Sequence, residues 1–457
     1  MPPRNLIWLG AIAVAAIIAV WASRPAPHQD APRDEHLRAI GDACRTIQRN
    51  YHRPVDDSEL VRLAIKGLAQ IDEYSTYVPP EQIAAFQARV GGSWRDIGLR
   101  LEVVEGEATV LGSLAGSPAH KAGIFGGDKL LEVNGRDVAG MTLEQIKALL
   151  DDESPEVRLT VLQAAGRRQE YRLPRGQAPV ETVTGLFRNR AGQWVHYVDP
   201  EETVAYVRVK EFTHDTVGTL NRVVRQFGAP KALILDLRDN PGGLLAAAVG
   251  VADLFLREGT IVTSVGRDGQ PVVYRAHSDD TLPDDLALVV LVNESTASAA
   301  EIVAGALRLH DRAVVVGART TGKGSVQSLI PLESGMGQIN LTTAEYFIGE
   351  NVPISRRAGA TNWGVEPHVH CPLPPGRREE LSALRVRSEV VPRPSAATLP
   401  TTGPHGEEPL ENFLSLDAQL AKALELAGDP DRVRQTLREA AAGRADRKTH
   451  EDRPATD

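Results

Sequence analysis

Apolar and polar residues follow two different spacings in the first part of the chain. Over residues 36–90 the apolar positions have helical spacing, as in SELVRLAIKGLAQI, which predicts amphipathic helices. Over residues 91–175 they alternate with polar residues in short runs separated by glycine, as in IGLRLEVV and EVRLTVLQ. The sequence therefore predicts an N-terminal helical region followed by a small, mostly β domain.

Between residues 176 and 373, strand-like and helix-like runs take turns along the chain. The runs ALILDL and LALVVLV are almost wholly apolar, as strands are when both faces of their sheet are covered. Strands that alternate with helices favour a parallel, layered sheet. We expect a multidomain α/β protein whose main domain spans 176–373 and carries the small β domain as an insertion.

The region after residue 373 has a different composition. Residues 374–412 are rich in Pro, Arg and Glu and are expected to form an exposed insertion. A helical pattern, DAQLAKALELAG, returns within residues 413–430. The remaining residues, 431–457, are predicted to be a disordered tail.

Residues 6–22, LIWLGAIAVAAIIAVWA, form a run of apolar and small residues that follows Arg4. As a helix this run would reach roughly 26 Å, against about 30 Å for the hydrocarbon core of a bilayer. Residues 1–23 are therefore predicted to be a signal peptide or a signal anchor, and Trp21 and the length of the run favour the anchor. A buried soluble helix explains the run poorly, since a Pro- and charge-rich stretch follows it. We expect a cell-envelope protein, periplasmic or otherwise extracytoplasmic, anchored to the inner membrane by residues 6–22.

Composition narrows the classes of partner. Hydrophobic residues make up 42% and charged residues 24% of the 457 residues, which is typical of a folded globular protein. The net charge is −9 and no long basic run occurs, so no nucleic-acid partner is expected. The histidines are scattered, and no Cys/His cluster has the spacing of zinc ligands. We expect neither a metal nor another cofactor.

Three stretches in the α/β region carry candidate chemistry. The first, Asp236 to Gly243 (DLRDNPGG), follows a buried strand, and such strand ends gather functional groups in α/β folds. Its Gly242 and Gly243 can bring bare backbone N–H groups close to a substrate oxygen, because no Cβ intervenes. A plain tight turn explains the same residues.

The second stretch, NESTASAAE, places Ser298 at the start of a predicted helix. There the free N–H groups and the helix dipole favour a developing oxyanion. A second interpretation stays open, because Ser298 and Glu301 have the spacing of a capping box, in which the serine only caps the helix.

The third stretch, TTGKGSVQ, carries Lys323. Together with Gly317 it approaches a phosphate-binding loop, but Gly324 stands where that loop needs a magnesium-binding Ser or Thr. The following residues have the pattern of a strand, whereas a phosphate loop needs the N-terminus of a helix. A nucleotide-binding role is therefore not expected, and a surface lysine in a glycine turn is the other alternative.

The stretch GSPAHKAGIFGGDKLLEVNGRDV resembles a PDZ domain, whose usual sequence motif in this region is close to SPAxxAGxxxGDxIxxING. The resemblance implies that the C-terminal carboxylate of a partner is received at the edge formed by Gly98, Leu99, Arg100 and Leu101. Exposed N–H groups would bind that carboxylate while the peptide adds as a strand to the sheet. A spacer domain without a ligand is the alternative.

Taken in order, the motifs resemble the carboxy-terminal processing peptidases, the S41 family of tail-specific proteases, over most of residues 36–370. The motifs STASAAEIVAGAL and TTGKGSVQ are the most specific. The resemblance implies a crotonase-like layered ββα peptidase core, with Ser298 as nucleophile, Lys323 as general base and Gln327 orienting the lysine. The oxyanion hole that it implies consists of the backbone N–H groups of Ala299 and of Gly242 or Gly243.

This mechanism makes one physical demand on Lys323. A free lysine has a pKa of about 10.4 and is not a base near neutral pH. Lys323 must therefore lie where its charged form is poorly solvated, which lowers its pKa. Neutral, it could take the proton of Ser298 during attack on a peptide bond and return it to the leaving amine. Gln327 could aim the amine without adding charge.

The expected partners are protein or peptide substrates with apolar C-termini, the membrane through the N-terminal segment, and an activator or adaptor protein as a further candidate. Two other functions stay open on the sequence alone. One is a catalytically inactive peptidase-like scaffold that presents envelope partners, which turnover would exclude. The other is an acyl-CoA enzyme of the crotonase class, in which Ser298 and Lys323 would share no role.

Overall fold

The computed structural model describes residues 34–451, with the exception of 91–92, 152–153, 176, 180, 278, 280 and 394–406. The apolar segment 6–22, and with it the predicted signal anchor, lies outside the described residues. Within the described ranges, no helix has both the length and the apolar character needed to cross a membrane.

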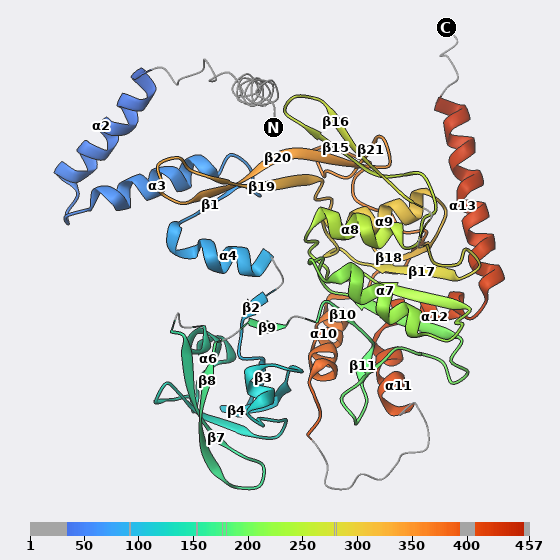
Figure 1. The fold of residues 1–457 in the computed structure, drawn as a ribbon, viewed down its shortest axis with the longest axis horizontal. Helices are drawn as coiled ribbons and strands as arrows, with labels where there is room; N and C mark the ends of the chain where they lie inside the picture. The colour runs from blue at the N-terminus through green and yellow to red at the C-terminus, as the bar shows by residue number, and fades with distance from the viewer. Residues whose placement is uncertain are drawn as a thin grey trace, which may run out of the picture.

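The N-terminal region extends from the body of the molecule as a series of helices (Figure 1). Its elements are α2 (Asp34–Asn50), α3 (Asp57–Ala69), β1 (Thr76–Val78), a 3₁₀ turn (Pro80–Gln82) and α4 (Ile83–Val90). Helices thus occupy the range for which the sequence predicts them. The strand β1 joins a sheet of the main domain, where Tyr77 lies opposite Ile339.

The small β domain is connected to the body through two strands that pair with each other, β2 (Ser93–Arg95) and β9 (Gln177–Pro179). Its own elements are β3 (Leu99–Val104), β4 (Glu107–Ser113), α5 (Pro118–Lys121), β5 (Lys129–Val133), β6 (Arg136–Asp137), α6 (Leu143–Leu150), β7 (Glu156–Leu162) and β8 (Arg168–Pro174). We call residues 96–174 the PDZ-like domain. Its sheet has the order β3-β4-β5-β7-β8, with Ile146 of α6 fully buried against it. Among the described strands, none pairs with the outer side of β3.

The main domain is built on a sheet in the order β10-β13-β14-β17-β18-β22. Its strands are β10 (Val183–Thr184), β13 (Val204–Val209), β14 (Ala232–Asp236), β17 (Ala287–Val292), β18 (Val314–Gly317) and β22 (Val369–His370). The strands from β13 to β22 run parallel, and β10 is antiparallel to β13. Every residue of β14, β17 and β18 is buried, as the apolar runs predict.

A second, antiparallel sheet lies apart from the first and has the order β1-β20-β15-β16, with β19 and β21 also paired to β20. Its further strands are β15 (Thr260–Gly266), β16 (Pro271–Arg275), β19 (Ser325–Pro331), β20 (Gln338–Ile348) and β21 (Val352–Pro353). A short hairpin, β11 (Phe187–Arg188) and β12 (Trp194–Val195), completes the strands. Because β1 belongs to this sheet, the N-terminal region is part of the main domain's framework.

Helices fill the space between the sheets and cover the outer face of the parallel one (Figure 1). One apolar cluster joins the parallel sheet, α7 (Thr216–Gln226), α8 (Leu245–Asp253), α9 (Ala299–Leu309) and Tyr346 of β20. A second cluster joins the opposite face of the parallel sheet to C-terminal helices. The predicted layered α/β architecture with an inserted β domain is confirmed.

The described part of the C-terminal region is helical. An exposed insertion is predicted over 374–412 and a disordered tail over 431–457. The described residues form α10 (Pro375–Glu389), which is mostly exposed, α11 (Glu407–Leu416), α12 (Ala418–Ala427) and α13 (Pro430–Glu451), so a helix stands where the tail is predicted. Within α10, Arg385 and Leu381 are buried, and Arg385 pairs with the carboxylates of Asp236 and Asp239, which an exposed insertion does not predict. Val433 anchors the start of α13 in the second apolar cluster.

Candidate active site

The candidate residues lie at the ends of three neighbouring parallel strands. Asp236 ends β14, Ser298 follows β17 through a short loop, and Lys323 follows β18. Because the carboxyl ends of parallel strands meet at one edge of a sheet, the fold brings the three sequence motifs together. We call residues 237–243 the glycine loop and residues 293–298 the serine loop.

Ser298 stands immediately before α9 and is partly exposed. Its φ of 57° and ψ of −123° lie outside the conformations that residues with a Cβ ordinarily adopt. Such strain persists only where the surroundings fix it, and it is concentrated at functional sites. A residue that only caps a helix does not need this strained conformation, so the backbone of Ser298 favours a functional role over simple capping.

Glu301 connects the serine to the lysine. Its fully buried carboxylate accepts the N–H of Ser298 at 2.8 Å and the N–H of Lys323, also at 2.8 Å. The N–H of Gly322 and the hydroxyl of Thr320 donate to the same carboxylate, at 2.7 and 2.5 Å. Burial raises the pKa of Glu301, and these four donors oppose that rise. Glu301 thus makes the capping contact that its spacing from Ser298 predicts. The same carboxylate also fixes the backbone of Lys323.

The side chain of Lys323 is partly buried, with its Nζ 4.9 Å from the centre of the Tyr74 ring. Burial lowers the pKa of Lys323, while the carboxylates of Glu301 and Glu73 act in the opposite direction. The net shift is the one that a general base needs. Tyr74 lies just before β1, so the N-terminal region supplies one wall of the site.

Tyr346 lies on β20, is buried, and touches both candidate residues. Its hydroxyl donates to the backbone carbonyl of Lys323 at 2.6 Å and lies near the side chain of Ser298. Burial raises the pKa of Tyr346, so the phenol stays neutral. Sequence reasoning missed Tyr346 and Tyr74, because no local motif marks a tyrosine that arrives from the other sheet.

Gln327 does not contact Lys323 through any hydrogen bond of the described residues. Its Nε2 donates to Ser325 Oγ at 2.8 Å and to Thr342 Oγ1 at 3.3 Å. The reason is its place in the β19–β20 ladder, where a register shift after Val326 sets Gln327 opposite Thr342. Gln327 is therefore close to Lys323 in sequence, but its side-chain amide points along the sheet toward Ser325 and Thr342.

Of the three predicted oxyanion donors, two have N–H groups without a described partner, those of Ala299 and Gly243. The N–H of Gly242 is occupied, because it donates to Asn240 Oδ1 at 2.8 Å. Gly242 instead gives room, since a Cβ on it would lie 2.7 Å from the Cβ of Ser298 and 2.9 Å from the nitrogen of Ala299. The pair available for an oxyanion is therefore Ala299 and Gly243.

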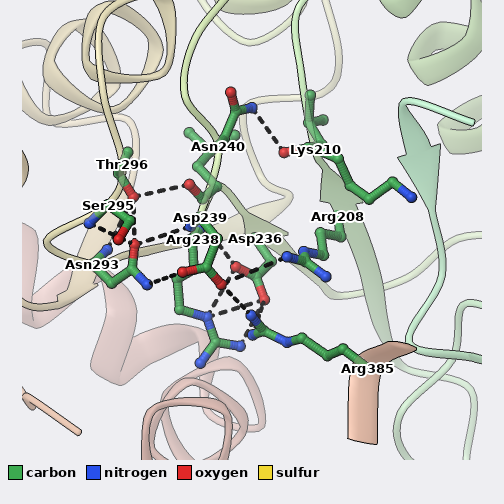
Figure 2. A network of polar contacts seen from close by, with 12 residues as sticks. Arg208, Lys210, Asp236, Arg238, Asp239, Asn240, Asn293, Ser295, Thr296 and Arg385 are labelled. Carbon is green, nitrogen blue, oxygen red and sulfur yellow. Dashed lines mark hydrogen bonds and ion pairs between the residues drawn. The ribbon is translucent and has the colours of Figure 1, made fainter. Parts of the chain in front are cut away.

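A cluster of charged side chains lies beside the glycine loop (Figure 2). Arg238, which is 1% exposed, pairs with Asp236 and with Asp417, each at 2.6 Å. Arg385 of α10 joins from the other side. Burial would raise the pKa of Asp236, but the guanidinium groups of Arg238 and Arg385 outweigh it and hold that pKa well below its ordinary value. We call these side chains, together with Asp239, the ionic cluster.

The predicted peptide edge of the PDZ-like domain is formed but partly occupied. The carboxylate of Asp96 accepts the N–H of Gly98 at 2.9 Å and a guanidinium N–H of Arg100, also at 2.9 Å. Leu99 is buried and Leu101 is partly buried on β3, whose outer side stays open. An incoming carboxylate would meet a site in which an internal carboxylate already lies.

Comparisons with known proteins agree with this arrangement. A family model described as peptidase family S41 matches residues 203–371, and one described as a PDZ domain matches residues 109–163. Over 345 residues the chain is 33% identical to the carboxy-terminal processing protease CtpA of Bacillus subtilis, which covers 75% of this chain and 70% of that protein.

Two further relatives extend this likeness. The carboxyl-terminal-processing protease of Synechocystis is 35% identical over 308 residues, covering 65% of this chain and 69% of that protein. Among solved structures, the photosystem II D1 C-terminal processing protease is similar at 26% identity with a TM-score of 0.43, covering 78% of this chain and 98% of that one. The matched regions are those in which the sequence predicts the α/β core and the small β domain.

Proposed function

Because the chain belongs to peptidase family S41, and is therefore a serine peptidase of the carboxy-terminal processing type, we propose that Ser298 is its nucleophile and Lys323 its general base. The predicted family is confirmed by the curated relatives. The observation that carries the proposed dyad is the carboxylate of Glu301, which holds the backbones of both residues. The strained backbone of Ser298 and the lowered pKa of Lys323 support the same assignment.

The proposed reaction follows from these positions. Ser298 Oγ bonds to the scissile carbonyl carbon while its proton moves to the neutral amine of Lys323. The carbonyl electrons move to oxygen, which the N–H groups of Ala299 and Gly243 receive. When the C–N bond breaks, the lysine returns its proton to the leaving amine. Water, deprotonated by the same lysine, then attacks the acyl carbon, and the lysine returns that proton to Ser298 Oγ as the acyl C–O bond breaks.

The substrate class and the location are also part of the proposal. The open side of β3 suits an extended peptide, and we assign it to apolar substrate C-termini that either dock there or gate the active site. An activator or adaptor protein would act on the same domain. The apolar run 6–22 supports a place in the cell envelope, at the outer side of the inner membrane.

The test is cleavage of an unstructured protein with an apolar C-terminus. The soluble chain beginning at Arg33 is compared with Ser298→Ala and Lys323→Ala. Each substitution is expected to lower kcat by roughly 10³-fold or more, since it removes a group on which the chemical step depends. Ser295→Ala, in the same loop, and Lys231→Ala, on the surface, are matched controls and should cleave like the parent.

Folding is checked by circular dichroism for every variant. Loss of cleavage in both test variants, with both controls active, supports the dyad. Cleavage that persists in Ser298→Ala would exclude this nucleophile. A parent that binds the substrate without turnover would favour the inactive scaffold considered above.

A further inference from the structure

Arg385 is a buried arginine that the proposed mechanism does not use. It lies on α10, and 8% of the residue is exposed. Its guanidinium donates to Asp239 Oδ2 at 2.6 Å and to Asp236 Oδ2 at 3.3 Å. A buried charge is tolerated only where opposite charges surround it. Asp236 also pairs with Arg238 at 2.6 Å. Asp239 also pairs with Arg208 at 3.6 Å, so Arg385 shares each carboxylate with a second arginine. The positions of Arg385 and of these two carboxylates are therefore interdependent.

Asp239 is the partner that reaches the active site. It belongs to the glycine loop and has a φ of 59°, a conformation that residues with a Cβ rarely adopt. Asn293 of the serine loop holds it from one side, accepting the N–H of Asp239 at 2.9 Å and donating to Asp239 Oδ1 at 2.7 Å. Arg385 holds the second carboxylate oxygen. Three hydrogen bonds, together with an ion pair to Arg208 at 3.6 Å, thus fix a strained residue at the junction of the two loops.

The shape of the glycine loop after Asp239 decides where its amides point. The next residue, Asn240, is buried and accepts the N–H of Ala297 on its backbone oxygen at 2.9 Å. Its side chain accepts the N–H of Gly242 and so leaves the N–H of Gly243 as the open donor. A rotation at Asp239 would move both Gly242, which lies against Ser298, and the open amide.

The C-terminal end of α10 contacts the PDZ-like domain. Just after the helix, the N–H of Val391 donates to the carbonyl of Ser113 at 2.9 Å, and Arg393 pairs with the buried carboxylate of Asp128. Near its last turn, Arg387 pairs with Glu102 of β3 at 3.0 Å. Figure 1 shows α10 between the parallel sheet and this domain. The helix that carries Arg385 therefore joins the peptide-binding module to the glycine loop.

We propose that Arg385 is a positioning residue of the peptidase. It holds the glycine loop through Asp239 so that the N–H of Gly243 faces the oxyanion, and α10 links this arrangement to the PDZ-like domain. Stability alone explains the ionic cluster poorly, because buried ion pairs are often no more stabilising than apolar side chains of similar size. The inference rests on the proposed site at Ser298, and it predicts that contacts at the far end of α10 affect catalysis.

The test uses the full-length chain purified in detergent, with Arg385→Ala, Arg385→Lys and the remote variant Arg393→Ala. Arg377→Ala, on the exposed face of α10, is the matched control. Four quantities are measured: kcat and KM for a peptide substrate, the rate at which a fluorophosphonate labels Ser298, and the hydrogen–deuterium exchange of residues 237–243. Thermal unfolding is followed for each variant.

Arg385→Ala is expected to lower kcat and the labelling rate by roughly 10²-fold, the effect of losing one oxyanion donor, with KM nearly unchanged. Arg385→Lys should restore part of that loss, because an ammonium retains the charge but not the fork that reaches two carboxylates. Arg393→Ala should lower the labelling rate about fivefold, as expected for coupling between distant sites. In all three variants the glycine loop should exchange faster, and Arg377→Ala should match the parent.

Two results would overturn the proposal. One is an Arg385→Ala protein that unfolds at a lower temperature but, while folded, keeps the parent's kcat and loop exchange, which is the behaviour of a stabilising residue only. The other is an Arg393→Ala protein indistinguishable from Arg377→Ala. A parent that the fluorophosphonate does not label contradicts the nucleophile instead, and the exchange of residues 237–243 still decides the role of Arg385.

Discussion

At the scale of single residues, the proton affinity of Lys323 depends on neighbours that act in opposite directions. Burial lowers its pKa and is the largest effect, while the negative charges of Glu301 and Glu73 raise it. The face of the Tyr74 ring, 4.9 Å from Nζ, also favours the charged amine. Burial thus favours the neutral amine of Lys323, whereas two carboxylates and one aromatic ring favour the charged amine. Each of these three groups can be removed by a separate substitution.

This balance predicts a pH dependence. The proposed mechanism requires the neutral amine, so the rate should rise with pH through a pKa below the ordinary lysine value of about 10.4. In Tyr74→Leu the ammonium loses a stabilising contact, so the midpoint of the pH–rate profile should move down by about half a unit to one unit. Tyr77→Leu is the control, since that hydroxyl bonds to the carbonyl of Met336, away from the lysine. An upward shift in Tyr74→Leu would contradict this account of the base.

At the scale of elements, the sequence could predict which candidate functional residues follow the ends of the parallel strands. The glycine loop, Ser298 and Lys323 each follow an apolar run, and neighbouring parallel strands bring such ends together. It could not predict Tyr346, which comes from the other sheet, because pairing between distant strands leaves no local pattern. The sequence also could not predict that Arg385 of α10 is buried, because amino-acid composition does not distinguish an arginine that pairs with buried carboxylates from one in solvent.

The contact between the glycine loop and α9 predicts the effect of one methyl group. Gly242 has a φ of 104°, and a Cβ there would lie 2.7 Å from the Cβ of Ser298. Gly242→Ala must displace the loop, so kcat should fall by roughly 10²- to 10³-fold as the oxyanion donor moves. Gly269→Ala is the matched control, with a φ of 71° but nothing within 4 Å of the added Cβ. Equal kcat values for both variants would show that the loop tolerates displacement.

At the scale of the whole molecule, the PDZ-like domain is attached in two places. Its two chain connections pair as β2 and β9, and residues 391–393 contact it from the C-terminal side. Its proposed peptide edge contains the carboxylate of Asp96, which occupies the N–H of Gly98 and the guanidinium of Arg100 that we assign to a substrate C-terminus. A peptide that enters this edge must therefore compete with a group of the domain itself.

This competition predicts that Asp96→Ala binds peptides more tightly. The substitution frees the N–H of Gly98 and the guanidinium of Arg100 for an incoming carboxylate. Because hydrogen bonds to charged groups contribute about 1.5–3 kcal/mol, the Kd for a peptide with a free apolar C-terminus should fall by roughly 10-fold or more. Fluorescence anisotropy measures this, with the same peptide amidated at its C-terminus as control. If free and amidated peptides bind alike, this edge does not recognise carboxylates.

The pairing of Arg238 with Asp417 has a consequence for how the protease is made. The two residues are 179 positions apart, and Asp417 also caps the first turn of α12 by accepting the N–H of Leu420. A nascent chain therefore has its serine and lysine long before the carboxylate that completes the ionic cluster beside the glycine loop. We expect the emerging polypeptide to be inert until α12 has left the ribosome and docked against the parallel sheet.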